Sequence, residues 1–170
     1  MKARHITRPL AVAFAIAGAN LVSVFVPPAS AAPCPDVEVV FARGTGEPPG
    51  VGGIGQSFVD ELRAKLGSRT VDVYPVDYAA SGDFTNREAF AGTVIAGVRD
   101  AGAHVQSTAQ NCPNTKIVLG GYSQGAVVAG YVTAAQVPAG VPTSVTPAPL
   151  PAAVADHVAA VTLFGKPSPA

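Results

Sequence analysis

The segment Pro-Asn-Thr-Lys-Ile-Val-Leu-Gly-Gly-Tyr-Ser-Gln-Gly, residues 113–125, decides the fold. Its apolar part, residues 116–119, predicts a short buried strand, and residues 124–133 predict a helix. Between them, residues 121–125 fit the pattern G-x-S-x-G, with Ser123 at its centre. A strand, a sharp turn and a helix form the context in which this pattern marks a nucleophilic serine.

The two glycines of the pattern, Gly121 and Gly125, have a physical role in such a turn. A larger side chain at either position would crowd the crossing strand and helix. The turn would place Ser123 at the carboxyl edge of a parallel sheet, with the N–H of Gln124 directed at a developing oxyanion. The alternative is an ordinary glycine-rich turn from strand to helix.

Strand and helix patterns alternate along the rest of the chain. Strands are predicted at residues 36–41, 70–76, 116–119 and 158–164, helices at 54–66, 86–109 and 124–133, and irregular surface at 137–151. This order predicts an α/β fold. It would be a three-layer sandwich with a central, mostly parallel sheet of four to five strands and helices on both faces.

The loop after the first strand, Arg43-Gly44-Thr45, would share the carboxyl edge of the sheet with Ser123. An acyl-transfer site needs a second oxyanion donor from a loop after an early strand. Thr45 could supply it through its backbone N–H and its hydroxyl. The alternative is a tight turn whose threonine satisfies its own backbone.

Composition limits the partners and the compartment. The chain has 11 basic and 11 acidic residues and no basic run, so a nucleic-acid partner is not expected. No CxxC, HExxH or histidine cluster occurs, so no metal site is expected. Residues 1–32 have the basic start, apolar middle and Ala-x-Ala site of a signal peptide, which predicts export. The alternative, a membrane anchor, is disfavoured because the apolar run is short and interrupted by polar residues.

Two cysteines remain after the leader, Cys34 and Cys112. In an exported chain, an even pair predicts a disulfide, here between the mature N-terminus and the segment before the Ser123 strand. The enclosed loop is long, so the bond would stabilise the fold by about 4 kcal/mol. Two buried free thiols are the alternative.

The chain resembles the cutinases, secreted serine esterases with a small α/β-hydrolase fold. Residues 113–125 match the nucleophile signature of that family, residues 42–47 (ARGTGE) resemble its oxyanion loop, and Cys34 and Cys112 resemble its first disulfide. The resemblance covers residues 33–170 as one cutinase-like domain.

The resemblance implies that Ser123 attacks an ester carbonyl while Thr45 and Gln124 hold the oxyanion. The substrates would be short to medium acyl esters, lipids or polyesters, and no cofactor is implied. The protein would be secreted, in the medium or at the cell wall, with no membrane span after cleavage.

The chain departs from the family at its C-terminus. Cutinases carry a second cysteine pair around a catalytic Asp and then a catalytic His, and this sequence ends before either. After Ser123, the candidates are Asp156 and His157, which would lie at the start of the last strand, roughly 20 Å from the serine. We therefore interpret them as ordinary polar residues.

His104 is expected to be exposed or to cap its helix, and Asp77 and Asp83 could line a pocket at the active edge. The sequence thus predicts a C-terminally truncated esterase. It would have very low activity, because a serine without a base is a weak nucleophile. A completed chain would be a monomer, and a truncated one would be prone to aggregation. The alternatives are a non-catalytic secreted binding protein that keeps the fold, or a thioesterase or acyltransferase that uses Ser123.

Overall fold

The computed structural model describes residues 33–137 and 144–167, which belong to one compact unit, Pro33–Ala170. The predicted signal peptide, residues 1–32, lies outside the described residues. Within the described ranges, no helix is both long enough and apolar enough to cross a membrane.

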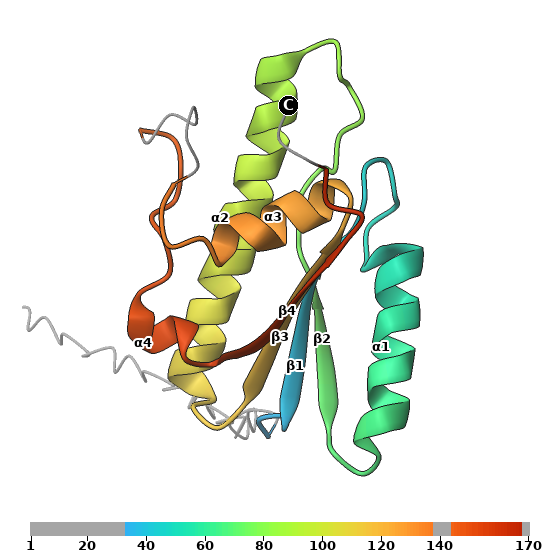
Figure 1. The fold of residues 1–170 in the computed structure, drawn as a ribbon, viewed down its shortest axis with the longest axis vertical. Helices are drawn as coiled ribbons and strands as arrows, with labels where there is room; N and C mark the ends of the chain where they lie inside the picture. The colour runs from blue at the N-terminus through green and yellow to red at the C-terminus, as the bar shows by residue number, and fades with distance from the viewer. Residues whose placement is uncertain (1–32, 138–143, 168–170) are drawn as a thin grey trace, which may run out of the picture. The chain divides into compact units, whose positions relative to one another are not determined.

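A sheet of four strands forms the centre of this unit, in the order β2-β1-β3-β4, and every neighbouring pair is parallel (Figure 1). The strands are β1 (Val37–Ala42), β2 (Val71–Pro75), β3 (Lys116–Tyr122) and β4 (Val158–Phe164). The predicted α/β fold with a parallel sheet is confirmed.

Strand β3 runs further than predicted, because Gly120, Gly121 and Tyr122 continue the ladder to β4 instead of starting the turn. A Cβ on Gly120 would lie 2.7 Å from the ring of Phe41, so the glycine leaves the space that this ring fills. The absence of a side chain here serves packing, and it does not end the strand.

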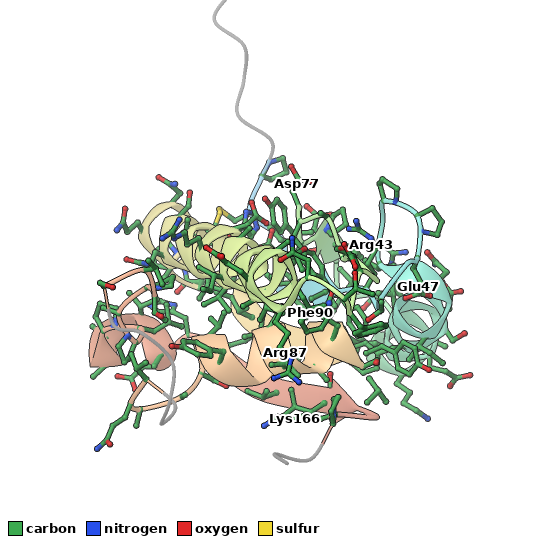
Figure 2. The ribbon with its side chains drawn as sticks, turned by 90° about the horizontal axis from the view of Figure 1, so that it is seen from above. Arg43, Glu47, Asp77, Arg87, Phe90 and Lys166 are labelled. Atoms are coloured by element: carbon green, nitrogen blue, oxygen red, sulfur yellow. A yellow bond between two sulfur atoms is a disulfide. The ribbon has the colours of Figure 1, made fainter. Side chains whose placement is uncertain are left out.

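Helices cover both faces of the sheet (Figure 1). They are α1 (Gly52–Leu66), α2 (Arg87–Asn111), α3 (Gln124–Val132) and the short α4 (Ala152–Ala155), which was not predicted. Helix α1 ends at Gly67, whose φ is 63°. Helix α2 begins after Asn86, whose side chain accepts the backbone N–H of Ala89 at 3.0 Å. Figure 2 shows the same helices from above, with Glu47 beside α1.

Two apolar layers bury the central strands β1 and β3, as the alternation along β1 requires, whereas Val161 and Leu163 of the edge strand β4 are exposed. Val39 and Phe41 face α1, where the rings of Phe41, Phe58 and Phe164 cluster with centroids 5.6–6.2 Å apart. Val40, on the opposite side of β1, packs in the layer under α2 and α3. The central strands, which lead to the Thr45 loop and to Ser123, are therefore packed on both faces.

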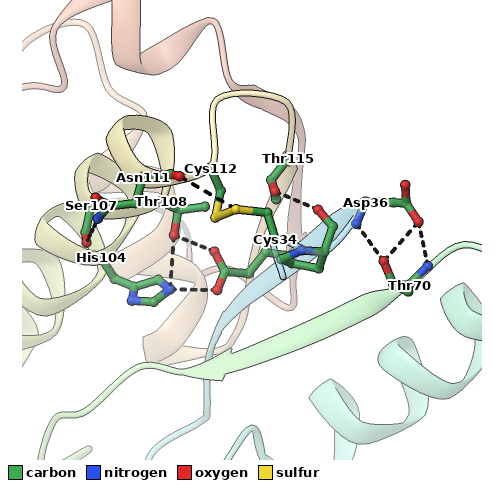
Figure 3. Close-up of a disulfide and its surroundings, with 11 residues drawn as sticks. Cys34, Asp36, Thr70, His104, Ser107, Thr108, Asn111, Cys112 and Thr115 are labelled. Atoms are coloured by element: carbon green, nitrogen blue, oxygen red, sulfur yellow. Dashed lines mark hydrogen bonds and ion pairs between the residues drawn. A yellow bond between two sulfur atoms is a disulfide. The ribbon is translucent and has the colours of Figure 1, made fainter. Parts of the chain in front are cut away.

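The predicted disulfide between Cys34 and Cys112 is confirmed, with the two Cα atoms 5.5 Å apart (Figure 3). It lies at the amino edge of the sheet, beside a second cross-connection. There, the Nε2 atom of His104 on α2 lies 2.9 Å from the carboxylate of Glu38 on β1, and the hydroxyl of Thr108 donates to the same carboxylate at 2.6 Å. His104 is thus a half-buried partner of Glu38, and the expectation that it is exposed or caps its helix is wrong.

This cluster predicts an acid-sensitive contribution to stability. Burial raises the pKa of Glu38, but the hydrogen bonds from His104 and Thr108 outweigh burial, so the net pKa lies below the ordinary 4.5. A lowered folded-state pKa stabilises the protein above pH 4.5, and this contribution is lost as the pH falls through the folded value. Glu38→Gln should lower the free energy of unfolding by about 1–2 kcal/mol at neutral pH, and it should flatten the acid limb of a plot of Tm against pH. If parent and variant lose Tm in parallel from pH 6 to pH 3, Glu38 is not a source of the acid sensitivity.

Candidate active site

The turn between β3 and α3 consists of Ser123 alone, because β3 ends at Tyr122 and α3 begins at Gln124. Ser123 has φ 53° and ψ −114°, a conformation that residues with a side chain rarely adopt. Three backbone bonds hold it there: its N–H donates to the carbonyl of Phe164 at 2.9 Å, and its carbonyl accepts the N–H groups of Ala126 at 3.0 Å and Val127 at 3.3 Å. The surroundings thus impose a strained backbone on a partly exposed serine.

The glycines on either side of Ser123 lie where backbone meets backbone. A Cβ on Gly121 would be 2.1 Å from the carbonyl oxygen of Gly125. A Cβ on Gly125 would be 2.0 Å from the carbonyl oxygen of Ala42, at the end of β1. The strand and the helix therefore cross so closely that neither position accommodates any side chain.

The loop after β1, residues 43–47, lies next to this turn, because the last residue of β1 pairs with Gly121 of β3. The carboxylate of Glu47 stabilises this loop by accepting two backbone hydrogen bonds. It accepts the backbone N–H of Gly44 at 2.6 Å and that of Gly53, in α1, at 2.9 Å. The loop is thereby tied to the start of α1.

Thr45 lies at the tip of this loop. Its neighbour Gly46 donates to the carbonyl of Ala80, in the loop after β2, at 2.8 Å. Among the described residues, neither the N–H of Thr45 nor that of Gln124, the first residue of α3, has a hydrogen-bond acceptor. The two predicted oxyanion donors thus follow β1 and β3 at the same edge of the sheet.

The side chain of Gln124 has a second task that the sequence did not indicate. It is 3% exposed, and its Nε2 donates to the carbonyl of Ser81 at 3.1 Å. Arg43 is also buried, and it bonds to the carbonyls of Val76 and Tyr78. Both residues lie in motifs quoted above, but nothing in a motif says which distant carbonyl a side chain will reach.

No described histidine lies near Ser123. The carbonyl of His157 accepts the N–H of Ile117 at the start of the β3–β4 ladder, whereas Ser123 bonds to Phe164 at its end. The length of β4 places these two points roughly 20 Å apart. His104 bonds to Glu38, which pairs with Ile117 in the sheet register, so it also lies towards the amino edge.

Of the acidic candidates, Asp83 stabilises a turn in the loop after β2. Asp83 accepts the N–H of Thr85 at 3.0 Å, and the bonds from Thr85 lower the pKa of Asp83. The N–H of Asp77, which is labelled in Figure 2, donates to the carboxylate of Asp100 on α2 at 2.8 Å. Asp156 ends α4, beside His157 and far from the turn. In the described part of the chain, no group of three His, Cys, Asp or Glu side chains could hold a metal ion.

Known proteins share this architecture. The cutinase family model matches residues 33–170. "Phospholipase Culp4" of Mycobacterium tuberculosis is 49% identical over 166 residues, which cover 98% of this chain and 68% of that protein. "Probable carboxylesterase Culp3" of the same organism is 52% identical over 146 residues, which cover 86% of this chain and 51% of that protein.

Two solved structures are also similar. A Trichoderma reesei cutinase in complex with a phosphonate inhibitor is 37% identical with a TM-score of 0.56, over 76% of this chain and 51% of that one. The catalytic core domain of an acetyl xylan esterase from Trichoderma reesei is 27% identical with a TM-score of 0.60, over 79% of this chain and 65% of that one. The chain thus spans about half to two thirds of the length of these relatives. The match to the family model and the identity to the two mycobacterial proteins establish that the chain belongs to the cutinase family.

Proposed function

We propose that this protein hydrolyses carboxylic esters through an acyl-enzyme on Ser123. The observation that carries the proposal is the strained Ser123 turn, with the unpartnered N–H groups of Thr45 and Gln124 at the same edge of the sheet. The names of the relatives, a phospholipase and a carboxylesterase, support acyl esters and lipids as the substrate class.

In the proposed reaction, the Oγ of Ser123 attacks the ester carbonyl carbon and the carbonyl oxygen becomes negatively charged. The N–H groups of Thr45 and Gln124 donate to this oxygen and stabilise its charge. The C–O bond to the alcohol then breaks, and the alcohol leaves with a proton. Water attacks the acyl-enzyme in the same way, which releases the carboxylic acid and restores the serine.

This reaction needs a base that takes the proton from Ser123. Among the described residues, no histidine lies within hydrogen-bond reach of Ser123. Removal of the proton from the serine hydroxyl therefore limits the rate of the proposed reaction. For a serine enzyme without its base, the oxyanion hole and substrate binding leave roughly a thousand-fold acceleration over water. We also propose that the protein is exported, which fits the disulfide and the features of residues 1–32.

The experiment supplies the base from outside. The purified protein is incubated with p-nitrophenyl butyrate, with and without imidazole, beside a Ser123→Ala variant. We expect slow hydrolysis by the parent alone and a marked increase with imidazole, beyond the catalysis by imidazole in solution. Because the increase passes through the serine hydroxyl, Ser123→Ala should lose all of it, and intact-mass analysis should find a butyryl group on the parent only.

Either of two other results would change the proposal. Equal rates for parent and Ser123→Ala at every imidazole concentration would reject Ser123 as the nucleophile, and would favour a binding protein with this fold. If the parent instead hydrolyses the ester at enzyme-like rates without imidazole, and Ser123→Ala abolishes these rates, the protein itself supplies a base. Ser123 would then remain the proposed nucleophile, and only the expected need for imidazole would be wrong.

A further inference from the structure

A buried tyrosine and a buried arginine join two loops beside Ser123. Arg43 follows β1, Tyr78 follows β2, and each is 5% exposed. The Nη2 of Arg43 donates to the backbone carbonyl of Tyr78 at 2.5 Å, while the hydroxyl of Tyr78 donates to the backbone carbonyl of Arg43. Each side chain thus binds the backbone of the other residue, so neither loop can shift without breaking a buried hydrogen bond.

Arg43 also closes the loop that carries Thr45. Its Nε donates to the carbonyl of Glu47 at 2.8 Å, so the side chain at one end of the loop holds the backbone at the other end. Within the described residues, no carboxylate pairs with the guanidinium, whose carbon lies 5.1 Å from the ring centre of Tyr78. The charge of Arg43 therefore serves to fix backbone carbonyls and not to form an ion pair.

The ring of Tyr78 is held as firmly as its hydroxyl. A Cβ on Gly97 of α2 would lie 3.1 Å from this ring and 3.1 Å from Val128 of α3, so both helices pack tightly around it. Burial raises the pKa of Tyr78 to about 12, and the hydroxyl consequently stays protonated and can donate at any ordinary pH.

The carbonyl that accepts this hydroxyl adjoins the Ser123 turn. A Cβ on Gly125 would lie 2.5 Å from the carbonyl oxygen of Arg43, so this carbonyl packs directly against the backbone that follows Ser123. We propose that Tyr78 and Arg43 are positioning residues, which hold the N–H of Thr45 in register with Ser123. This inference rests on the proposed function and extends it to residues that do not touch substrate.

The test removes one hydroxyl. Tyr78→Phe keeps the buried ring and deletes only the bond to the carbonyl of Arg43. In the imidazole assay we expect kcat to fall about tenfold with KM unchanged, because a loosened donor weakens binding of the oxyanion but not of the ester. The matched control is Tyr74→Phe, whose hydroxyl donates to Asp100 at 3.0 Å and not to this loop. It should leave kcat unchanged.

A second variant guards against a purely structural effect. Arg43→Lys keeps the positive charge but replaces the planar guanidinium, whose several N–H groups reach different carbonyls, by one ammonium group. It should lower kcat by a similar factor. The double variant should lose no more than the larger single loss, because both changes release the same loop. The amide NMR signal of Thr45 should shift and exchange faster in Tyr78→Phe but not in Tyr74→Phe.

The outcomes separate this inference from the proposed function. A Ser123-dependent rate that is the same in Tyr78→Phe and Tyr74→Phe would overturn the inference and leave the proposed function intact. If the parent has no Ser123-dependent rate, the proposed function fails, and the NMR signal then decides the positioning role. An unchanged Thr45 signal in Tyr78→Phe would overturn it.

Discussion

Replacing Gly125 by alanine is expected to lower the free energy of unfolding by more than about 3 kcal/mol, beyond the usual range for overpacking. The new Cβ would lie 2.0 Å from the carbonyl oxygen of Ala42 and 2.5 Å from its carbonyl carbon. Strand β1 cannot withdraw, because it is hydrogen-bonded to β2 on one side and to β3 on the other. The chain must therefore displace α3 and with it the Ser123 turn.

The control for this prediction is another glycine-to-alanine change. Gly102 lies inside α2, and a Cβ there would meet no atom within 4 Å. Gly102→Ala should therefore be neutral or stabilise the protein by up to about 1 kcal/mol, as expected inside a helix. Urea denaturation of the two variants measures the difference. A Gly125→Ala variant that unfolds at the parent midpoint would show that α3 and β1 do not cross as closely as described.

The elements that the sequence predicted best are those marked by an apolar run or by apolar residues at helical spacing. The last strand was predicted at residues 158–164 and is found there, and α1 begins only two residues before its predicted start. The prediction failed where glycines carried the signal. Gly120 and Gly121 looked like the beginning of a turn, but whether a glycine ends a strand depends on what fills its empty side, and here Phe41 does.

The candidate site also has features that the sequence predicted and features that it did not. A short motif identified Ser123, and its place in the chain implied that a loop after the first strand would lie beside it. The contact between Arg43 and Tyr78 could not be predicted, because the two residues are 35 positions apart and meet only when β1 and β2 pair. Such contacts depend on the length of the side chains and on the packing of α2 and α3. Neither leaves a periodic pattern in the sequence from which the contact could be predicted.

Loss of the disulfide is the second change with a large expected effect. Cys34→Ser combined with Cys112→Ser should lower the free energy of unfolding by about 4 kcal/mol, because the bond joins residues 78 positions apart and its loss frees the unfolded chain. The folded state should survive. The hydroxyl of Thr115 still donates to the carbonyl of Pro35 at 2.6 Å, and Asp36 still bonds to Thr70.

Urea denaturation with and without a reductant separates the two states. The reduced parent should unfold at the midpoint of the double serine variant, which itself should not respond to reductant. Because the loss acts mainly on the unfolded chain, the amide NMR signals near Ser123, at the far edge of the sheet, should be the same in both proteins. Equal midpoints for the oxidised parent and the double variant would instead mean that the hydrogen bonds of Asp36 and Thr115 hold the amino-terminal segment without the disulfide.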